Sequence, residues 1–450
     1  MKLNTKLSLI FRFTITILAF VFPSKVEAVE LNVQPEVKVY TLADVLDLAK
    51  KNSPELMLSA AQEERQEGKL KAARSNFYPN IVLDGETTVG RYREGNFEES
   101  DAERNIRLAL LVDQKIYTGG RNKATYKKAK ALQEAARLRN KVVTNHLFFK
   151  IKESFYRYLT TSRKIEITEE HFLELEKELK KEKARFLAGS SPKVYSLRLE
   201  QALATTRSQL RSLDLEKGSQ RQLVFKLAGI PAEANISELE DALPQVKVEN
   251  QLSDLVLAAR ESRPEYGRFE ELITAAEHEI DAQRSKAKPD VSLFASYGLN
   301  HEYRDEGSND YNPEWQVGIS GKWVLFDSGE TRGLVKAARA EKRVRELQRI
   351  EFENELTKEV SLAYQKQVEA REQHENSSGL ARIAQSALVQ IKARYQIGKA
   401  SQLDILEAQT KLMEARLVEL DSDHKAAIAS ALLEKAVAAN LENHCSEIYQ

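Results

Sequence analysis

Two stretches of the chain alternate apolar and polar residues at every second position, the pattern of a β-strand with two unlike faces. In the first stretch the apolar positions are Ile106, Leu108, Leu110 and Val112. In the second they are Trp315, Val317, Ile319, Trp323 and Leu325. Polar residues such as Arg107, Gln316 and Lys322 fall on the opposite faces. The pattern predicts strand pairs within residues of about 80–117 and 290–327.

Apolar residues elsewhere recur at intervals of three and four, as on one face of a helix. The two longest such segments begin after Gly120 and Gly329 and run almost unbroken to residues 188 and 397. Each has about seventy residues, or roughly 100 Å at ~1.5 Å per residue, which is longer than a compact domain needs. Turns at 189–192 and 398–401 then send the chain back as a partner helix. Helices of this length predict a coiled coil or a helical barrel.

The two halves of the chain repeat one another. The segment LADVLDLAK at 42–50, followed by Ser-Pro-Glu, returns as LSDLVLAAR at 252–260, followed by Arg-Pro-Glu. Pro289 lies 210 residues after Pro79, and RFLAG at 185–189 returns as RYQIG at 394–398. These matches predict a helix–strand–strand–helix unit used twice. We expect the opening helix of each unit to run to about residue 77 or 288, where proline stops it.

The chain ends and the join between the repeats lack these patterns. Residues 1–28 combine a positive start, a short apolar run and a small-x-small site, and therefore resemble a signal peptide. We expect the first repeat at 38–228, a connector at 229–250, the second repeat at 251–439 and a flexible tail at 440–450. Beyond residue 28 no stretch reaches the roughly 20 apolar residues of a spanning helix, so any membrane-spanning part must consist of strands.

Composition and charge argue against several classes of function. The chain carries 68 Lys and Arg residues and 68 Asp and Glu residues, and it offers no basic stripe to a nucleic acid. The seven histidines show no metal-ligand spacing, and no phosphate-binding glycine loop or nucleophile motif occurs. We therefore expect no enzyme activity, no cofactor and no metal, with energy for any transport supplied by a partner.

Two strand pairs give four strands, which are too few to close a barrel in lipid because open edges would leave backbone groups unpaired. Three chains would supply twelve strands, within the range of outer-membrane barrels. Trp315, Trp323 and Tyr297 are then expected in an aromatic belt at the membrane interface. A soluble periplasmic sandwich with the same alternation is the alternative, and the length of the helices favours the barrel.

The strand-to-helix junction and the second turn carry a resemblance to a known family. The junction reads LFDSG at 325–329, and the turn reads RYQIG at 394–398, followed by LDILEA at 403–408. With the paired leucine-rich openings, these motifs resemble the TolC family of outer-membrane factors over residues of about 38–439. The resemblance implies a mainly α fold with β: a homotrimer with a twelve-stranded outer-membrane β-barrel, continued by a long periplasmic α-helical coiled-coil barrel.

The resemblance also implies a function and partners. A protein of this kind is the outer-membrane exit duct of a tripartite efflux pump or a type I secretion system. Its expected partners are outer-membrane lipid, a periplasmic adaptor protein and an inner-membrane pump, with no nucleic acid. The turns at Gly189, Ser190, Gly398 and Lys399 are the expected adaptor-docking tips, although any helical hairpin needs such turn chemistry. The residues indicate neither the cargo nor the class of pump.

Asp404 and Glu407 stand three residues apart just after the second turn, on one face of a helix. In a trimer they would form a ring of six carboxylates that attracts cations, although acids also simply favour the first turn of a helix. The resemblance places constriction acids here and assigns Tyr395 to a closed-state polar network. Ala400 and Tyr195 stand where that network has a basic residue and its acidic partner, so we expect closure to differ.

The main rival interpretation is a soluble periplasmic coiled-coil adaptor or scaffold, which also has long helical hairpins. It predicts a single hairpin and no strands in lipid, whereas the sequence predicts two hairpins and two strand pairs. An exported helical enzyme is a more remote alternative, because no catalytic constellation is present.

Overall fold

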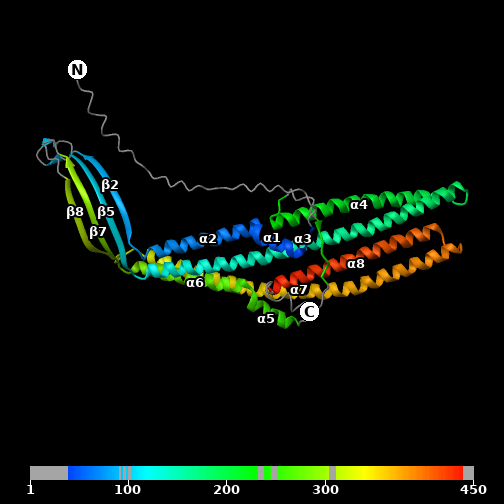
Figure 1. Cartoon of the computed structure of the whole chain (residues 1–450). Coiled ribbons are helices and arrows are strands. Elements are labelled where there is room, and N and C mark those ends of the chain that lie inside the picture. Colours follow the sequence, from blue (N-terminus) through cyan, green and yellow to red (C-terminus); the bar gives the residue numbers. More distant parts are fainter. Residues whose placement is uncertain are drawn as a thin grey trace, which may run out of the picture.

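The computed structural model describes residues 39–90, 93–94, 98–99, 103–231, 238–244, 251–303 and 311–438. The expected signal peptide at 1–28 and the tail at 440–450 lie outside the described residues. The described chain is elongated, with a sheet at one end, two helical hairpins at the other and short elements around the middle (Figure 1). Within the described ranges, no helix has the length and hydrophobicity needed to cross a membrane.

The two repeats fold alike. The first contains α1 (Leu42–Asn52), α2 (Pro54–Ser75), β2 (Asn80–Gly90), β5 (Glu103–Thr118), α3 (Arg121–Leu187) and α4 (Lys193–Ala228). The second contains α5 (Leu252–Ser262), α6 (Pro264–Arg284), β7 (Asp290–Tyr303), β8 (Tyr311–Lys322), α7 (Glu330–Gln396) and α8 (Gln402–Val437). Both α3 and α7 have 67 residues, and both α4 and α8 have 36. The equal lengths of these long helices follow from the duplication in the sequence.

The opening helix of each repeat is divided in two, where the sequence led us to expect one unbroken helix. Pro54 begins α2 and Pro264 begins α6. Proline lacks a backbone N–H and disfavours helical backbone in the residue before it, so Ser53 and Arg263 are extended. The break lets α1 pack against α3 and α4, and α5 against α7 and α8, instead of continuing the line of α2 and α6.

Four strands form one antiparallel sheet in the order β2–β5–β7–β8. Since β5 and β7 belong to different repeats, their pairing joins the repeats, and β2 and β8 are left as edges. β8 ends at Lys322, whose partner Asp290 is the first residue of β7. The apolar alternation that predicted strand to about 327 therefore continues past the last paired residue. Two short ladders, β1–β6 (Val39–Tyr40 with Glu238–Leu239) and β3–β4 (Arg93–Glu94 with Glu98–Glu99), complete the described strands.

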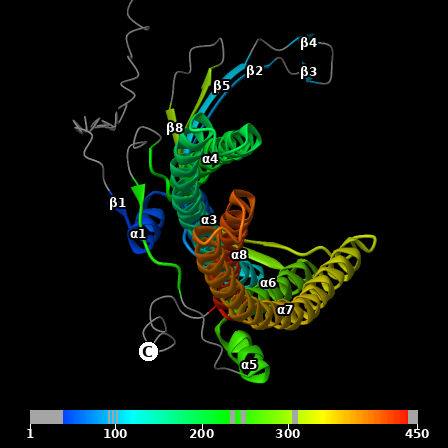
Figure 2. The same ribbon diagram turned by 90° about the vertical axis from the view of Figure 1, so that its right-hand side faces the viewer.

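The helices next to the sheet form a layer in the order α2, α3, α6, α7. Further from the sheet, α3 pairs with α4 and α7 pairs with α8, which gives the two hairpins, and α8 also packs on α3. Seen from the hairpin end, the long helices follow a curve (Figure 2). The layer therefore has two ends, α2 and α7, each with a neighbouring helix on one side.

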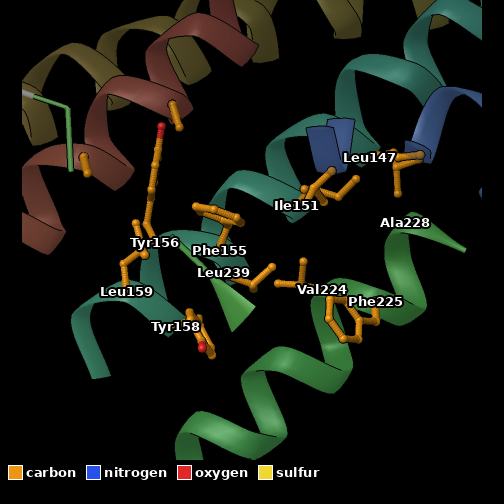
Figure 3. Packing of buried hydrophobic residues seen from close by; sticks show 14 residues of the cluster. Leu147, Ile151, Phe155, Tyr156, Tyr158, Leu159, Val224, Phe225, Ala228 and Leu239 are labelled. Carbon is orange, nitrogen blue, oxygen red and sulfur yellow. The ribbon is translucent and has the colours of Figure 1, made fainter. Parts of the chain in front are cut away.

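The largest apolar cluster lies at the middle of the molecule, where α1, α3, α4, β6 and α8 meet (Figure 3). Phe155, Tyr158 and Phe225 are at most 2% exposed there. A second cluster, around Leu356 and Val360, joins α5, α7 and the end of α8. Each large side chain contributes about 1.5–3 kcal/mol when fully buried, so these clusters fix the middle of both hairpins.

Candidate functional site at the hairpin tips and on the sheet

The two hairpin tips share one backbone turn. Gly189 and Gly398 have left-handed backbone, with φ of 69° and 74°. The N–H of Ser190 donates to the carbonyl of Arg185 at 2.9 Å, and Lys399 makes the equivalent bond at the second tip, also at 2.9 Å. These bonds close the helix ends in the Schellman arrangement, which favours glycine because a Cβ would strain left-handed backbone. The four residues predicted as docking tips are all exposed.

Asp404 closes the start of α8. Its backbone N–H donates to the Ser401 hydroxyl at 3.2 Å, and its carboxylate accepts from the Ser401 N–H at 2.7 Å. These two bonds form a capping box. The bond from the Ser401 N–H, then that from the Ser401 hydroxyl, and finally the charge of Arg394 lower the pKa of the Asp404 carboxyl. Asp404 therefore caps a helix and keeps its negative charge.

Glu407 lies one turn further along α8 and is exposed. With Asp404 it lines an open groove of about 410 Å³ between α7 and α8. Arg394, Lys399 and Lys411 line the same groove, over a floor made largely of alanine. The structure brings the two predicted acids to one face and sets basic residues of both helices beside them. From the sequence the acids were predicted as a pair and Lys399 only as a docking residue, whereas Arg394 and Lys411 were not predicted as their neighbours.

A row of mainly polar contacts joins α3 of the first hairpin to the second hairpin, through α8 in all pairs but the last, which reaches α7, and we call it the α3–α8 seam. From the middle of the molecule to the tips, its pairs are Lys152–Glu434, Thr160–His424, Lys164–Asp421, Glu170–Arg416, Glu174–Gln409, Glu178–Gln402 and Arg185–Tyr395. The five central pairs have polar atoms 2.7 to 3.3 Å apart. Leu406 adds an apolar contact against the cluster of Leu175 and Leu199.

Contacts of this kind hold the seam only moderately. An exposed ion pair contributes about 0–1 kcal/mol, and a shielded hydrogen bond to a charged group about 1.5–3 kcal/mol. Inside the second hairpin, by contrast, apolar residues such as Leu388, Ala408 and Leu412 pack together. In the tip region the apolar clusters lie mainly within one hairpin, and Leu406 reaches across to the other. The seam is therefore the weaker joint of the tip region.

The last pair of the seam lies beside the tips. Arg185 donates to the hydroxyl of Tyr395, and its guanidinium carbon lies 5.3 Å from the centre of that ring. Tyr395 was predicted from the sequence, whereas Arg185 was missed, although it opens the RFLAG motif that matches RYQIG. Tyr195 lies instead in the first turn of α4, where its N–H donates to the Pro192 carbonyl at 3.2 Å. The structure thus places Tyr395 in the seam. Tyr195 lies on α4, which takes no part in the Arg185–Tyr395 contact.

The sheet has one apolar and one polar face. Its register places Leu83, Leu110, Tyr297 and Trp315 in one row across all four strands. All four are exposed, and Trp315 is 75% exposed. The opposite face carries polar side chains, among them Asp84, Glu86, Arg107, Asp113, Ser296, Gln316 and Lys322. A single sheet with an apolar outer face and a polar inner face is the arrangement of a transmembrane barrel wall.

The aromatic residues predicted for a belt lie at two levels of this face. Tyr297 and Trp315 are direct partners on β7 and β8. Trp323 follows the last residue of β8, and its indole N–H donates to the Ala287 carbonyl at 3.1 Å. Trp323 therefore marks the level at which the sheet gives way to the helices.

Across the part of the chain that the structure describes, no group of three or more His, Cys, Asp and Glu side chains is placed to hold a metal ion.

Comparison with known families identifies the class of protein. The family model described as outer membrane efflux protein matches residues 45–229 and again residues 255–439. The two matches coincide with the two repeats and together cover most of the chain. The chain belongs to the outer membrane efflux protein family.

Several relatives match over most of their length. Protein CyaE of Bordetella pertussis is 24% identical over 385 residues, covering 83% of this chain and 79% of the relative. Outer membrane protein TolC of Vibrio cholerae is 23% identical over 402 residues, covering 83% and 85%. The solved structure of the Campylobacter jejuni CmeC outer membrane channel has a TM-score of 0.77 at 17% identity, covering 88% of this chain and 85% of that one. The open state of the Neisseria gonorrhoeae MtrE outer membrane channel has a TM-score of 0.72 at 16% identity, covering 88% of each.

The family expected from the sequence is thereby confirmed, and at these identities the solved structures establish the fold. The protein is an outer-membrane duct for efflux or secretion, with its long helices forming a periplasmic tunnel. The rival interpretation as a soluble periplasmic adaptor or scaffold is wrong, because the family match spans both repeats.

Proposed function

We propose that the protein works as a homotrimer whose three sheets close into one twelve-stranded outer-membrane barrel. The observation that carries this proposal is the four-stranded sheet with an apolar face and two open edges, β2 and β8. Pairing β8 of one copy with β2 of the next would satisfy the backbone groups at every edge, which lipid demands. Tyr297, Trp315 and Trp323 then form the interfacial belt, with their polar groups toward water or headgroups.

Below the barrel, the helices of three copies continue the duct through the periplasm. The exposed turns at Gly189, Ser190, Gly398 and Lys399 dock a periplasmic adaptor, which links the duct to an inner-membrane pump. Both tips have rigid turns closed by backbone bonds, and a partner can recognise a rigid tip at low entropic cost. The duct catalyses no reaction itself, and its transport is driven by the pump.

The tip end is the gate of the duct. The α3–α8 seam holds the second hairpin against the first, and the Arg185–Tyr395 contact is the link nearest the tips. The Arg185–Tyr395 contact replaces the basic–acidic link that the family resemblance implies. Ala400 and Tyr195 cannot make that link, because neither is the charged residue it needs. Opening separates the hairpins along this seam, whose contacts are mainly polar.

Asp404 and Glu407 form the constriction of the closed gate. Three copies bring six carboxylates together, and crowded carboxylates bind multivalent cations. Arg394, Lys399 and Lys411 line the same groove and reduce this field.

Single-channel recording tests the constriction. We predict that Asp404→Ala with Glu407→Ala weakens block by a trivalent cation at least ten-fold, because the multivalent site is lost. Ser401→Ala is the matched control, since it removes the hydroxyl partner of Asp404 and leaves the charge. Unchanged block in the double variant contradicts the assignment, and equal loss in Ser401→Ala would assign the effect to helix capping.

A further inference from the structure

Two arginines from different repeats lie close together where α3 packs on α6. A Cβ added to Gly267 would stand 3.0 Å from Cδ1 of Leu138, so these two residues lie at the same level. Arg139 and Arg268 are the next residue along each helix. Burial lowers the pKa of the Arg268 guanidinium, and the positive charge of Arg139 lowers it further. Like charges placed close together destabilise a helix contact, so packing alone does not explain this pair.

The pair lies on the concave side of the helical layer. Successive residues of a helix are turned by about 100°, so Arg137, Leu138 and Arg139 point in three different directions. Arg137 lines a groove together with Lys50 of α1, and Leu138 lies against α6, which leaves Arg139 on the side away from α1. Figure 2 shows α1 and α5 outside the curve of the long helices. The side away from them, with Arg139 and Arg268, is therefore the inner wall of the tunnel.

Neither arginine has an acidic partner. Within the described residues, the side chains of Arg139 and Arg268 make no hydrogen bond and no ion pair. Glu265 favours the charged form of Arg268, but Arg263 already donates to its carboxylate at 2.9 and 3.1 Å. The positive charge of Arg345 also reaches Arg268, although a carboxylate of its own helix pairs with it at 2.6 Å. Two positive charges on the inner wall are thus left without a counter-charge.

The surroundings of the pair are apolar. Elsewhere in the same helix contact, Lys128 of α3 pairs with Glu279 of α6 at 2.7 Å. One turn beyond the arginines on the same helix faces, by contrast, stand Val142, Val143 and Leu272, all half-buried. Charges beside apolar, half-buried side chains are less screened by water, and they attract an opposite charge more strongly.

The duplication does not account for the pair. Arg268 corresponds to Leu58, 210 positions earlier, and Arg139 corresponds to Gln348, 209 positions later. Neither of these residues is charged. The two arginines therefore belong to the contact between the repeats and are not inherited from the repeat itself.

We propose that Arg139 and Arg268 bind the oxyanion head of an amphipathic organic anion, and that the duct carries cargo of this class. Guanidinium groups hold a carboxylate or sulfonate through paired hydrogen bonds, and they keep their charge at any physiological pH. Val142 and Leu272 contact the apolar body of the anion. The inference rests on the proposed duct and adds a class of cargo to it. The site is open to the lumen, so the anion binds there in passing and leaves again.

Block of single-channel current tests the site in the full-length protein, with naphthalene-1-sulfonate as the probe. The probe should reduce the current through the unmodified protein. Arg139→Gln with Arg268→Gln should raise the concentration for half-maximal block at least ten-fold, because both guanidinium groups are lost. The neutral naphthalene-1-sulfonamide and inorganic sulfate should each block much less than the probe, because each lacks one half of the ligand.

Arg137→Gln is the matched control. It removes the same charge from the same turn of α3, but from the groove on the side of α1, and it should leave the block unchanged. Equal weakening of the block in Arg137→Gln would assign the effect to net charge and overturn the site. Block by inorganic sulfate as strong as that by the probe would overturn the amphipathic ligand.

The conductance steps separate failure of this inference from failure of the duct. Steps of normal size, with equal block in the double variant and the unmodified protein, overturn the site and leave the duct standing. An unmodified protein without steps overturns the duct and this inference with it. If only the double variant lacks steps, Arg139→Gln alone decides, because Arg139 is exposed and its substitution leaves the helix contact intact. Several-fold weaker block in that variant supports the site, and unchanged block overturns it.

Discussion

A histidine lies in the α3–α8 seam, in the second pair counted from the middle of the molecule. Burial lowers the pKa of the His424 imidazole, and the nearby charges of Arg157 and Lys164 lower it further. Asp421 and the Tyr156 carbonyl oppose this shift without reversing it. The packed seam therefore holds His424 in its neutral form.

This histidine predicts that mild acid loosens the seam. In a separated seam the pKa of His424 returns toward its ordinary value of about 6.5, so the open form binds the proton more tightly. The stability that His424 gives the packed seam is complete above that value and falls as the pH drops through it. Open probability in single-channel recording should therefore rise between about pH 7.5 and about pH 5.5, and His424→Gln should flatten this rise.

His374 provides the matched control for this prediction. It also lies on the hairpins, but its Nδ1 contacts Asp423 of the same hairpin at 2.6 Å. His374→Gln should keep the acid-induced opening of the unmodified protein. Loss of the rise in His374→Gln, with retention in His424→Gln, would refute a role for the seam histidine.

At the residue scale, the sequence predicted which residues matter better than it predicted which side chains they contact. The motif LDILEA placed Asp404 and Glu407 on one helix face, because helical spacing is a local property. It did not reveal that Ser401 and Asp404 cap each other, nor that Arg185 meets Tyr395. The second contact joins residues 210 positions apart, and it depends on how two hairpins pack.

Gly229 and Gly398 both end a helix with left-handed backbone, but they differ in how closely other atoms approach them. Substitutions at the two sites can therefore separate the cost of backbone conformation from the cost of packing. At Gly398 an added Cβ would meet nothing within 4 Å, whereas at Gly229 it would lie 2.1 Å from the Asn52 carbonyl oxygen. Their φ angles are similar, 74° and 70°. Any difference between alanine substitutions at the two sites therefore reports on packing.

We predict that Gly398→Ala lowers the free energy of unfolding by about 1 kcal/mol, the cost of left-handed backbone. Gly229→Ala should cost about 3 kcal/mol or more, because α4 and the end of α1 must also move apart. Denaturant unfolding followed by helical circular dichroism measures both. Equal costs at the two positions would show that the close approach of Gly229 to Asn52 contributes nothing.

At the scale of elements, the repeat and the helix lengths followed from sequence, while element boundaries depended on neighbours. The helices α3 and α7 were predicted almost in full, because glycine marks both ends of each pattern. The breaks at Pro54 and Pro264 were missed, because the apolar spacing continues across them. The end of β8 was placed too late, since a strand lasts only as long as its partner, and β7 begins at Asp290.

At the scale of the whole molecule, the described chain has open edges in both the sheet and the helical layer. The sheet ends in the free edges β2 and β8, and the helical layer ends in the exposed faces of α2 and α7. The two repeats join one another through β5–β7 and α3–α6, and the outer elements of each repeat form these edges. The sequence predicted four strands and hence the need for several copies, whereas the order of the helices in the layer follows only from how they pack.

We infer that the chain forms a duct closed at the tips by the α3–α8 seam. Recording the conductance of single purified assemblies in planar bilayers tests it most directly, with Arg185→Ala plus Tyr395→Phe as the opened variant. Arg198→Ala is the matched control, because Arg198 is exposed on α4 near the same tip. We expect discrete conductance steps in all three proteins and a several-fold higher open probability in the double variant only. The absence of conductance steps would contradict the duct, and equal open probabilities in all three proteins would contradict closure by the seam.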